Sequence, residues 1–142
     1  MSKRLVSSSV REQVEKRARH RCEYCQTIME SSTERFEMEH VIPQSKGGQS
    51  LLENLALSCR GCNGFKHNKM EGIDSLTNCI VPLFNPRKDV WKEHFTWDIN
   101  PLFLIGLTST GRATIEILKL NRPQLIGVRK LLEKINLHPP PL

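Results

Sequence analysis

Four cysteines in two Cys-x-x-Cys pairs, Cys22/Cys25 and Cys59/Cys62, constrain the fold of this chain more than any other feature. One Cys-x-x-Cys turn places two sulfurs on a metal ion, and two turns complete a tetrahedral four-thiolate zinc site with no open position. The alternative is four cysteines that are free or paired as disulfides. Two pairs at this spacing in a reducing compartment favour zinc. We predict a structural zinc site, and we interpret the unpaired Cys79 as an ordinary core or surface residue.

Composition indicates a globular protein that attracts polyanions. The chain has 142 residues, of which 38% are hydrophobic and 25% charged, and we expect a single domain over residues 1–142. No apolar run reaches the length of a membrane span, and the first residues lack the apolar core of a signal peptide. We therefore expect a cytoplasmic protein without a membrane partner. The net charge of +6 favours nucleic acid as a partner.

The first half of the chain predicts a helix, two strands and a second helix. Ser9 and Glu12 have capping-box spacing, which predicts a helix over residues 9–19. Residues 26–34 and 45–50 read as loops. Residues 36–42 read as a strand that ends at Pro43, and residues 55–57 as a second, short strand. Residues 60–70 lack proline and predict a helix that starts at the second cysteine pair.

The second half predicts loops and short strands over residues 80–101, a strand over 103–108 and a helix over 114–120. Asn121 is expected to cap a last helix with Pro123 in its first turn. The tail, residues 138–142, is expected to be disordered. The aromatic group of this half could stack on unpaired bases, but core packing is the more frequent use of such residues. Its members are Trp91, His94, Phe95 and Trp97.

Residues 22–69 resemble an HNH endonuclease domain, the ββα-metal family. The matching stretches are Cys22-Glu23-Tyr24-Cys25, Glu39-His40-Val41-Ile42-Pro43, Lys46-Gly47-Gly48, Asn54-Leu55 and Cys59-Arg60-Gly61-Cys62-Asn63-Gly64-Phe65-Lys66. The resemblance implies an α+β fold in which two strands and a helix clasp one divalent ion. It also implies cleavage of phosphodiester bonds in DNA, and occasionally in RNA. The stretch from Gly111 to Pro123 resembles the C-terminal extension of bacterial, notably cyanobacterial, HNH proteins.

The resemblance implies a role for individual residues. A neutral histidine is a suitable base near pH 7, and we interpret His40 as the general base that activates water. Glu39 and Asn63 are the expected ligands of a catalytic Mg²⁺ or Mn²⁺, with His67 a further candidate. Asn63 and His67 lie four residues apart and would share one face of a helix. Glu39 and His40 are adjacent on a strand, so both reach one ion only where the strand is distorted.

Four further residues have expected supporting roles. Asn54 is expected to brace the loop that orients His40. Lys66, Lys69 and Arg60 are the expected nucleic-acid contacts. We predict a zinc-stapled HNH core over residues 9–70 and a strand-and-helix extension over 71–142.

The function predicted from sequence is metal-dependent hydrolysis of DNA phosphodiesters. A non-catalytic, zinc-dependent nucleic-acid-binding module is the alternative, and a zinc-stabilised protein-interaction scaffold is a third possibility. The target sequence, the number of strands cut, the oligomeric state and the biological role are left open.

Overall fold

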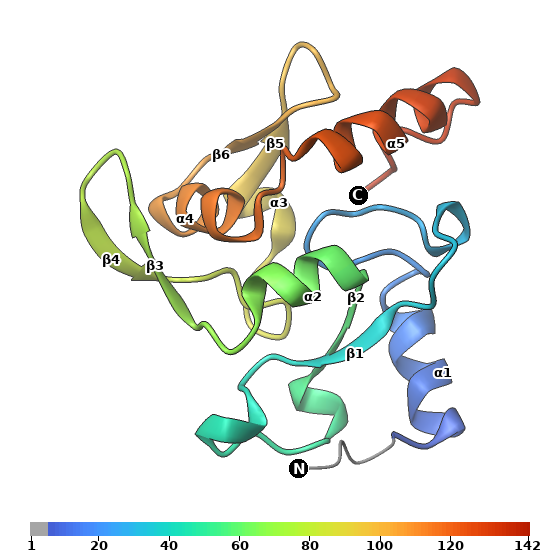
Figure 1. Cartoon of the computed structure of the whole chain (residues 1–142), viewed down its shortest axis with the longest axis vertical. Coiled ribbons are helices and arrows are strands. Elements are labelled where there is room, and N and C mark those ends of the chain that lie inside the picture. Colours follow the sequence, from blue (N-terminus) through green and yellow to red (C-terminus); the bar gives the residue numbers. More distant parts are fainter. Residues whose placement is uncertain (1–5) are drawn as a thin grey trace.

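The fold was obtained as a computed structural model, which describes residues 6–142 (Figure 1). The chain is a mixed α/β protein in which α2 lies between the N-terminal and C-terminal parts (Figure 1). The helices are α1 (Ser8–Arg17), α2 (Arg60–Lys66), α3 (Trp91–His94), α4 (Ser109–Leu118) and α5 (Pro123–Lys134). The strands are β1 (Glu37–His40), β2 (Leu55–Ser58), β3 (Glu71–Asp74), β4 (Cys79–Pro82), β5 (Phe95–Trp97) and β6 (Leu104–Gly106).

The N-terminal helix is confirmed, but its cap differs from the prediction. Ser7 is the N-cap, and its Oγ accepts a hydrogen bond of 3.2 Å from the amide of Val10. The helix therefore begins before the predicted capping box at Ser9. Its last turn is fastened to the core by Arg17, whose guanidinium donates to the carbonyl of Leu55 at 2.6 Å.

The two predicted strands and the following helix are confirmed as a ββα unit. β1 and β2 pair antiparallel, with Glu37 opposite Ser58 and His40 opposite Leu55. α2 then runs for seven residues from its N-cap, Cys59. It ends earlier than predicted, because His67 has a φ of 51° and turns the chain out of the helix.

The extension consists of two β-hairpins and three helices. β3 pairs with β4 and β5 with β6, both antiparallel. α4 starts five residues before the predicted helix, because Thr108 caps it by accepting from the amide of Gly111 at 3.0 Å. Pro123 occupies the first turn of α5 as predicted, but the N-cap is Arg122. Asn121 instead accepts from the amide of Leu104 at 2.7 Å and so holds the β5–β6 hairpin.

The aromatic group lies in the core and the tail is ordered. Trp91 and Phe95 are buried with ring centroids 5.0 Å apart, which confirms core packing over base stacking. The tail was predicted to be disordered, which is wrong. His138 is buried with its Nε2 2.6 Å from the carbonyl of Pro101 and its ring against Trp97. Within residues 6–142, no helix has the length and apolar character needed to cross a bilayer.

Candidate active site and metal centre

The four cysteines of the two Cys-x-x-Cys pairs meet in one buried cluster. Their sulfur atoms all lie within 4.8 Å of one another, and Cys25 and Cys59 have sulfurs 3.8 Å apart. Four thiolates bonded to zinc at about 2.3 Å have sulfurs about 3.8 Å apart in tetrahedral geometry. The cluster therefore fits a closed structural zinc site. Among residues 6–142 it is the one group of at least three His, Cys, Asp or Glu side chains close enough to hold an ion.

The local backbone builds the cluster from two turns. In the first turn the amide of Gln26 donates to the carbonyl of Cys22 at 2.9 Å, and Gln26 takes a φ of 65°. In the second turn Cys59 is the N-cap of α2, and its sulfur accepts from the amide of Cys62 at 3.4 Å. Hydrogen bonds from the neighbouring thiols lower the pKa of Cys59, whereas burial raises the pKa of Cys22. Cys79 is exposed on β4 and takes no part in the cluster.

A hollow of about 460 Å³ lies beside the cluster, between β1 and α2, and brings together most of the predicted catalytic residues. Its lining includes Glu37, Glu39, His40, Asn63 and His67. The imidazole of His40 is half-buried, and its Nε2 lies 2.8 Å from the hydroxyl oxygen of Ser50. Ser50 was not singled out in the sequence, where it closes a polar glycine-containing loop and carries no distinguishing signal.

Asn54 ties down the loop that follows His40. Its Oδ1 accepts from the amide of Ile42 at 2.8 Å, and its Nδ2 donates to the carbonyls of Ile42 and Gln49 at 3.1 and 2.9 Å. The loop packs so closely that a Cβ on Gly48 would lie 1.7 Å from the carbonyl oxygen of Ile42. The side chain of Asn54 therefore fixes both ends of the turn between β1 and the segment that precedes β2.

Glu39 points into the interior, where two donors hold its carboxylate. Its Oε2 accepts from Lys66 Nζ at 2.6 Å and its Oε1 from the hydroxyl of Tyr24 at 2.5 Å. Glu39 is 3% exposed and Lys66 is 2% exposed. Burial raises the pKa of Glu39 above its usual value, and the Lys66 ammonium opposes that rise. Burial also raises the pKa of Tyr24, so the phenol stays protonated and donates to Glu39.

This arrangement differs from two expectations. Lys66 was expected to contact phosphate, but its ammonium lies in the interior. There it also donates to the carbonyl of Val41 at 3.3 Å. Glu39 was expected to face an ion, and the structure gives its carboxylate an ammonium instead. Tyr24 was visible in the sequence only as a spacer of the first Cys-x-x-Cys pair.

Asn63 faces the hollow together with an acidic residue that sequence reasoning did not single out. Its Nδ2 donates to Glu37 Oε1 at 3.0 Å. Glu37 and Glu39 are two residues apart on β1 and so start from the same side of the strand. His67 lies beyond the end of α2, so the predicted shared helix face with Asn63 is wrong in detail. Both side chains nevertheless line the hollow.

Arg60 and Lys69, the remaining expected nucleic-acid contacts, are exposed at opposite ends of the α2 region. Arg60 lies 3.5 Å from the carboxylate of Glu34, and both side chains are more than half exposed. An exposed pair of this kind contributes at most about 1 kcal/mol and leaves the guanidinium accessible.

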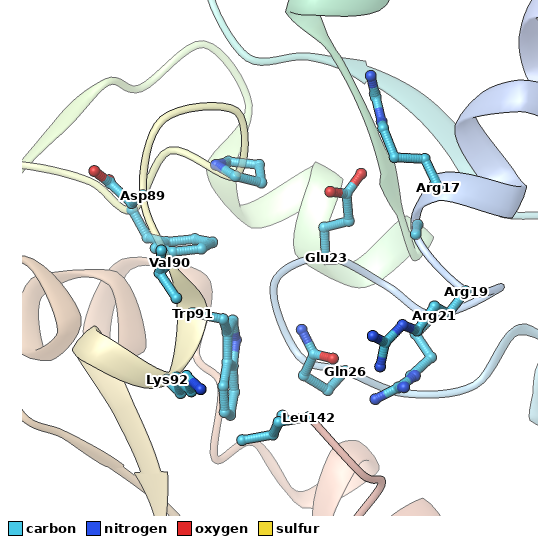
Figure 2. A pocket seen from close by; sticks show the side chains of 13 residues that line it. Arg17, Arg19, Arg21, Glu23, Gln26, Asp89, Val90, Trp91, Lys92 and Leu142 are labelled. Carbon is cyan, nitrogen blue, oxygen red and sulfur yellow. The ribbon is translucent and has the colours of Figure 1, made fainter.

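The extension contacts the turn that carries the first cysteine pair (Figure 2). Trp91 Nε1 donates to the carbonyl of Tyr24 at 2.9 Å, and Arg87 forms an ion pair with Glu23. A hollow of about 280 Å³ lies over this contact, and in Figure 2 the side chains of Arg17, Arg19 and Arg21 lie on one side of it and those of Trp91 and Lys92 on the other. Arginines here are largely engaged by backbone, as in the 2.6 Å bond from Arg21 to the carbonyl of Pro141.

The comparisons with known proteins place the family at this site. Residues 22–69, about a third of the chain, match the family model described as HNH endonuclease. The matched part contains a ββα unit and a four-cysteine cluster that fits zinc, which is consistent with the ββα-metal core of that family. Searches among curated proteins and among solved structures found no significant match. HNH domains as a family are nucleases that use divalent metals and act on nucleic acids.

Proposed function

We propose that this protein is a metal-dependent endonuclease that hydrolyses DNA phosphodiester bonds at the hollow between β1 and α2. The observation that carries the proposal is the position of His40, which lines this hollow together with Asn63 and His67. A hydrolytic nuclease needs a base, a place for the phosphate and charge compensation at the same point. The HNH match over the same residues supports this reading.

In this proposal His40 takes the proton from the attacking water. The contact between its Nε2 and Ser50 Oγ fixes the plane of the imidazole, and Asn54 fixes the backbone that follows it. A histidine whose ring is already held in one orientation loses less conformational entropy when the transition state forms. Near neutral pH an imidazole can accept a proton and later release it to solvent.

A divalent ion would be held by a carboxylate of β1 together with Asn63 and His67. Carboxylate and amide oxygens suit Mg²⁺ or Mn²⁺, and such donors line the hollow together with the imidazole of His67. When bound, the ion would offset the negative charge that develops on the phosphate and on the leaving oxygen. The predicted carboxylate is Glu39, which must exchange its Lys66 partner for the ion. Glu37 is the second carboxylate at the same hollow and already contacts Asn63.

The substrate class follows from charge. The chain carries a net charge of +6, and Arg60 and Lys69 are exposed beside α2. These cations would contact backbone phosphates, which position a strand without reading its sequence. DNA is the proposed substrate, and RNA is the related polyanion to be tested beside it.

One observation favours the alternative, a nucleic-acid-binding module without cleavage. The Lys66 ammonium already neutralises the Glu39 carboxylate in the interior. If this pair never opens, the hollow lacks its expected acidic ligand. Zinc-loaded protein would then bind DNA in a salt-sensitive manner and leave it uncut.

The test is plasmid cleavage by zinc-loaded protein with Mg²⁺ or Mn²⁺, beside His40→Ala and the matched control His20→Asn. The control removes an exposed imidazole outside the hollow and keeps a residue type that tolerates positive φ. Divalent-dependent cutting that survives in the control and is lost in a folded His40→Ala protein supports the proposal. Equal cutting by both variants refutes His40 as the base. Salt-sensitive DNA binding without cutting by the wild type supports the binding module.

A second pair of variants identifies the acidic ligand. Glu39→Gln and Glu37→Gln remove the same charge from the same side of β1, and Mn²⁺ binding can be followed by calorimetry independently of cleavage. We expect the larger loss of Mn²⁺ affinity in Glu39→Gln. A larger loss in Glu37→Gln would assign the ligand to Glu37 and leave Glu39 as a structural carboxylate.

A further inference from the structure

Arg122, the N-cap residue of α5, reaches from the extension onto the sulfurs of the second cysteine pair. Its Nη1 lies 3.7 Å from the sulfur of Cys62, and its Nη2 lies 3.7 Å from the sulfurs of both Cys59 and Cys62. A guanidinium presents several N–H donors in one plane, so one side chain can face two sulfurs at once. Arg122 thus contacts the cysteine cluster although it lies sixty residues after Cys62 in the sequence.

The surroundings hold the guanidinium in this position. Arg122 Nη1 also donates to the carbonyl of Leu118 at 3.0 Å, at the end of α4. Its Cζ lies 5.4 Å from the centre of the Phe65 ring, a cation–π distance. Gly61 leaves the space that the guanidinium fills, because a Cβ there would lie 2.4 Å from Arg122 Nη2. The approach is therefore built by three elements, α2, α4 and α5.

The positive charge of Arg122 would compensate the negative charge of a zinc–thiolate cluster. A zinc ion with four thiolates carries two net negative charges, and this cluster is largely withdrawn from water. A buried charge is costly unless a partner of opposite sign and hydrogen bonds compensate it. Arg122 supplies both. Groups that contact metal ligands in this way commonly change metal affinity by 10- to 100-fold.

We propose that Arg122 is the counter-cation of the zinc–thiolate cluster, so that the C-terminal extension completes the metal site of the HNH domain. Zinc binding and the seating of α5 on α2 are then thermodynamically coupled, and each strengthens the other. The extension also contacts the first cysteine pair, through Trp91 on the carbonyl of Tyr24. Residues 71–142 thus hold both halves of the cluster.

The test compares zinc retention in two matched pairs of variants, measured by competition with a chromogenic chelator. Arg122→Gln removes the charge that contacts sulfur. Lys119→Gln removes an exposed charge that lies 5.9 Å from the same Phe65 ring and has no described contact with sulfur. We expect 10- to 100-fold weaker zinc binding in Arg122→Gln, a smaller loss in Arg122→Lys and a change within twofold in Lys119→Gln.

The second pair moves Arg122 without altering charge. Gly61→Ala would push the guanidinium off the sulfurs, whereas Gly64→Ala in the same helix places its Cβ where nothing lies within 4 Å. We expect weaker zinc binding in Gly61→Ala and unchanged binding in Gly64→Ala. This pair keeps the inference testable if Arg122→Gln does not fold.

A spectroscopic measurement separates the role from general stability. In cobalt-substituted protein, loss of the N–H contacts makes the thiolates better electron donors, so the sulfur-to-cobalt band should move to longer wavelength in Arg122→Gln. A variant that melts earlier but keeps the wild-type band and zinc affinity would overturn the inference. So would equal zinc loss in Lys119→Gln, or wild-type protein that retains no zinc.

Discussion

Removal of the Lys66 ammonium should destabilise the protein by about 3–5 kcal/mol at pH 8, the usual cost of breaking a buried ion pair from one side. Both side chains of the Lys66–Glu39 pair are almost fully buried, so the value for screened surface pairs, about 0–1 kcal/mol, does not apply. In Lys66→Met the carboxylate keeps the hydroxyl of Tyr24 as a donor, which favours the lower end of the range. A loss of about 3 kcal/mol corresponds to a fall in melting temperature of about 10 °C.

The same pair predicts how that loss depends on pH. Burial already raises the pKa of Glu39, and Lys66 is the group that opposes the rise. Without Lys66 the pKa rises further, and the folded state binds a proton that the unfolded state does not. The destabilisation is therefore complete above the raised pKa and shrinks as the pH falls through it.

The assay is urea unfolding in saturating zinc at pH 8 and pH 5.5, with each variant compared with wild type at the same pH. Lys69→Met is the matched control, since Lys69 is exposed and should change stability by no more than about 0.5 kcal/mol. Lys66→Met with Glu39→Gln should recover part of the loss, because no buried charge then lacks a partner. A loss below about 1 kcal/mol in Lys66→Met at pH 8, or an equal loss at both pH values, refutes the reasoning.

Three further predictions concern the loop, the hairpin and the metal. Asn54→Ala removes the partner of the Ile42 amide and should lower the free energy of unfolding in urea by about 1–3 kcal/mol. If the proposed function holds, the same variant should also lose DNA cleavage. Hydrogen bonds from Arg112 lower the pKa of Asp74, so this pair stabilises the fold above about pH 4 and the effect is lost as the pH falls below that value. Asp74→Asn should therefore lie closest to wild type at the acidic end of a series of melting curves from pH 5 to pH 2. Chelation of zinc should abolish the near-ultraviolet dichroism, and zinc but not Mg²⁺ should restore it.

The ββα unit and its cysteine cluster could be predicted from sequence because their signals are local. Two cysteine pairs, a strand ended by Pro43 and a short apolar strand after Asn54 specify the ββα order without distant contacts. The C-terminal contacts could not be predicted in this way. His138 is ordered by Pro101 and Trp97, which lie about forty residues earlier and carry no mark of the pairing.

The inward position of Lys66 could have been predicted from its spacing to Cys62, although its charge favours a surface position. Lys66 lies four residues after Cys62, and residues at this spacing share one helix face. Since Cys62 is buried in the metal cluster, the same face carries Lys66 inward. Charged residues are mostly exposed, so the residue type alone predicts a surface position for Lys66. The helix spacing predicts the buried position that the structure shows. The buried carboxylate of Glu39 completes the explanation, and only the fold brings it there.

The position of α2 explains why the four-cysteine cluster lies next to the proposed active site. The helix has seven residues, two of them glycine, and an isolated helix of this length and composition is unstable in water. Its placement must therefore come from tertiary contacts: the thiolates at its first turn, Arg122 above them and the Glu39–Lys66 pair at its end. Asn63 directly follows Cys62, so whatever fixes the cysteine also fixes the side chain that faces the hollow. The cysteine cluster and the buried ion pair thus act from the two ends of one short helix, and neither needs to touch substrate to position Asn63 beside Glu37.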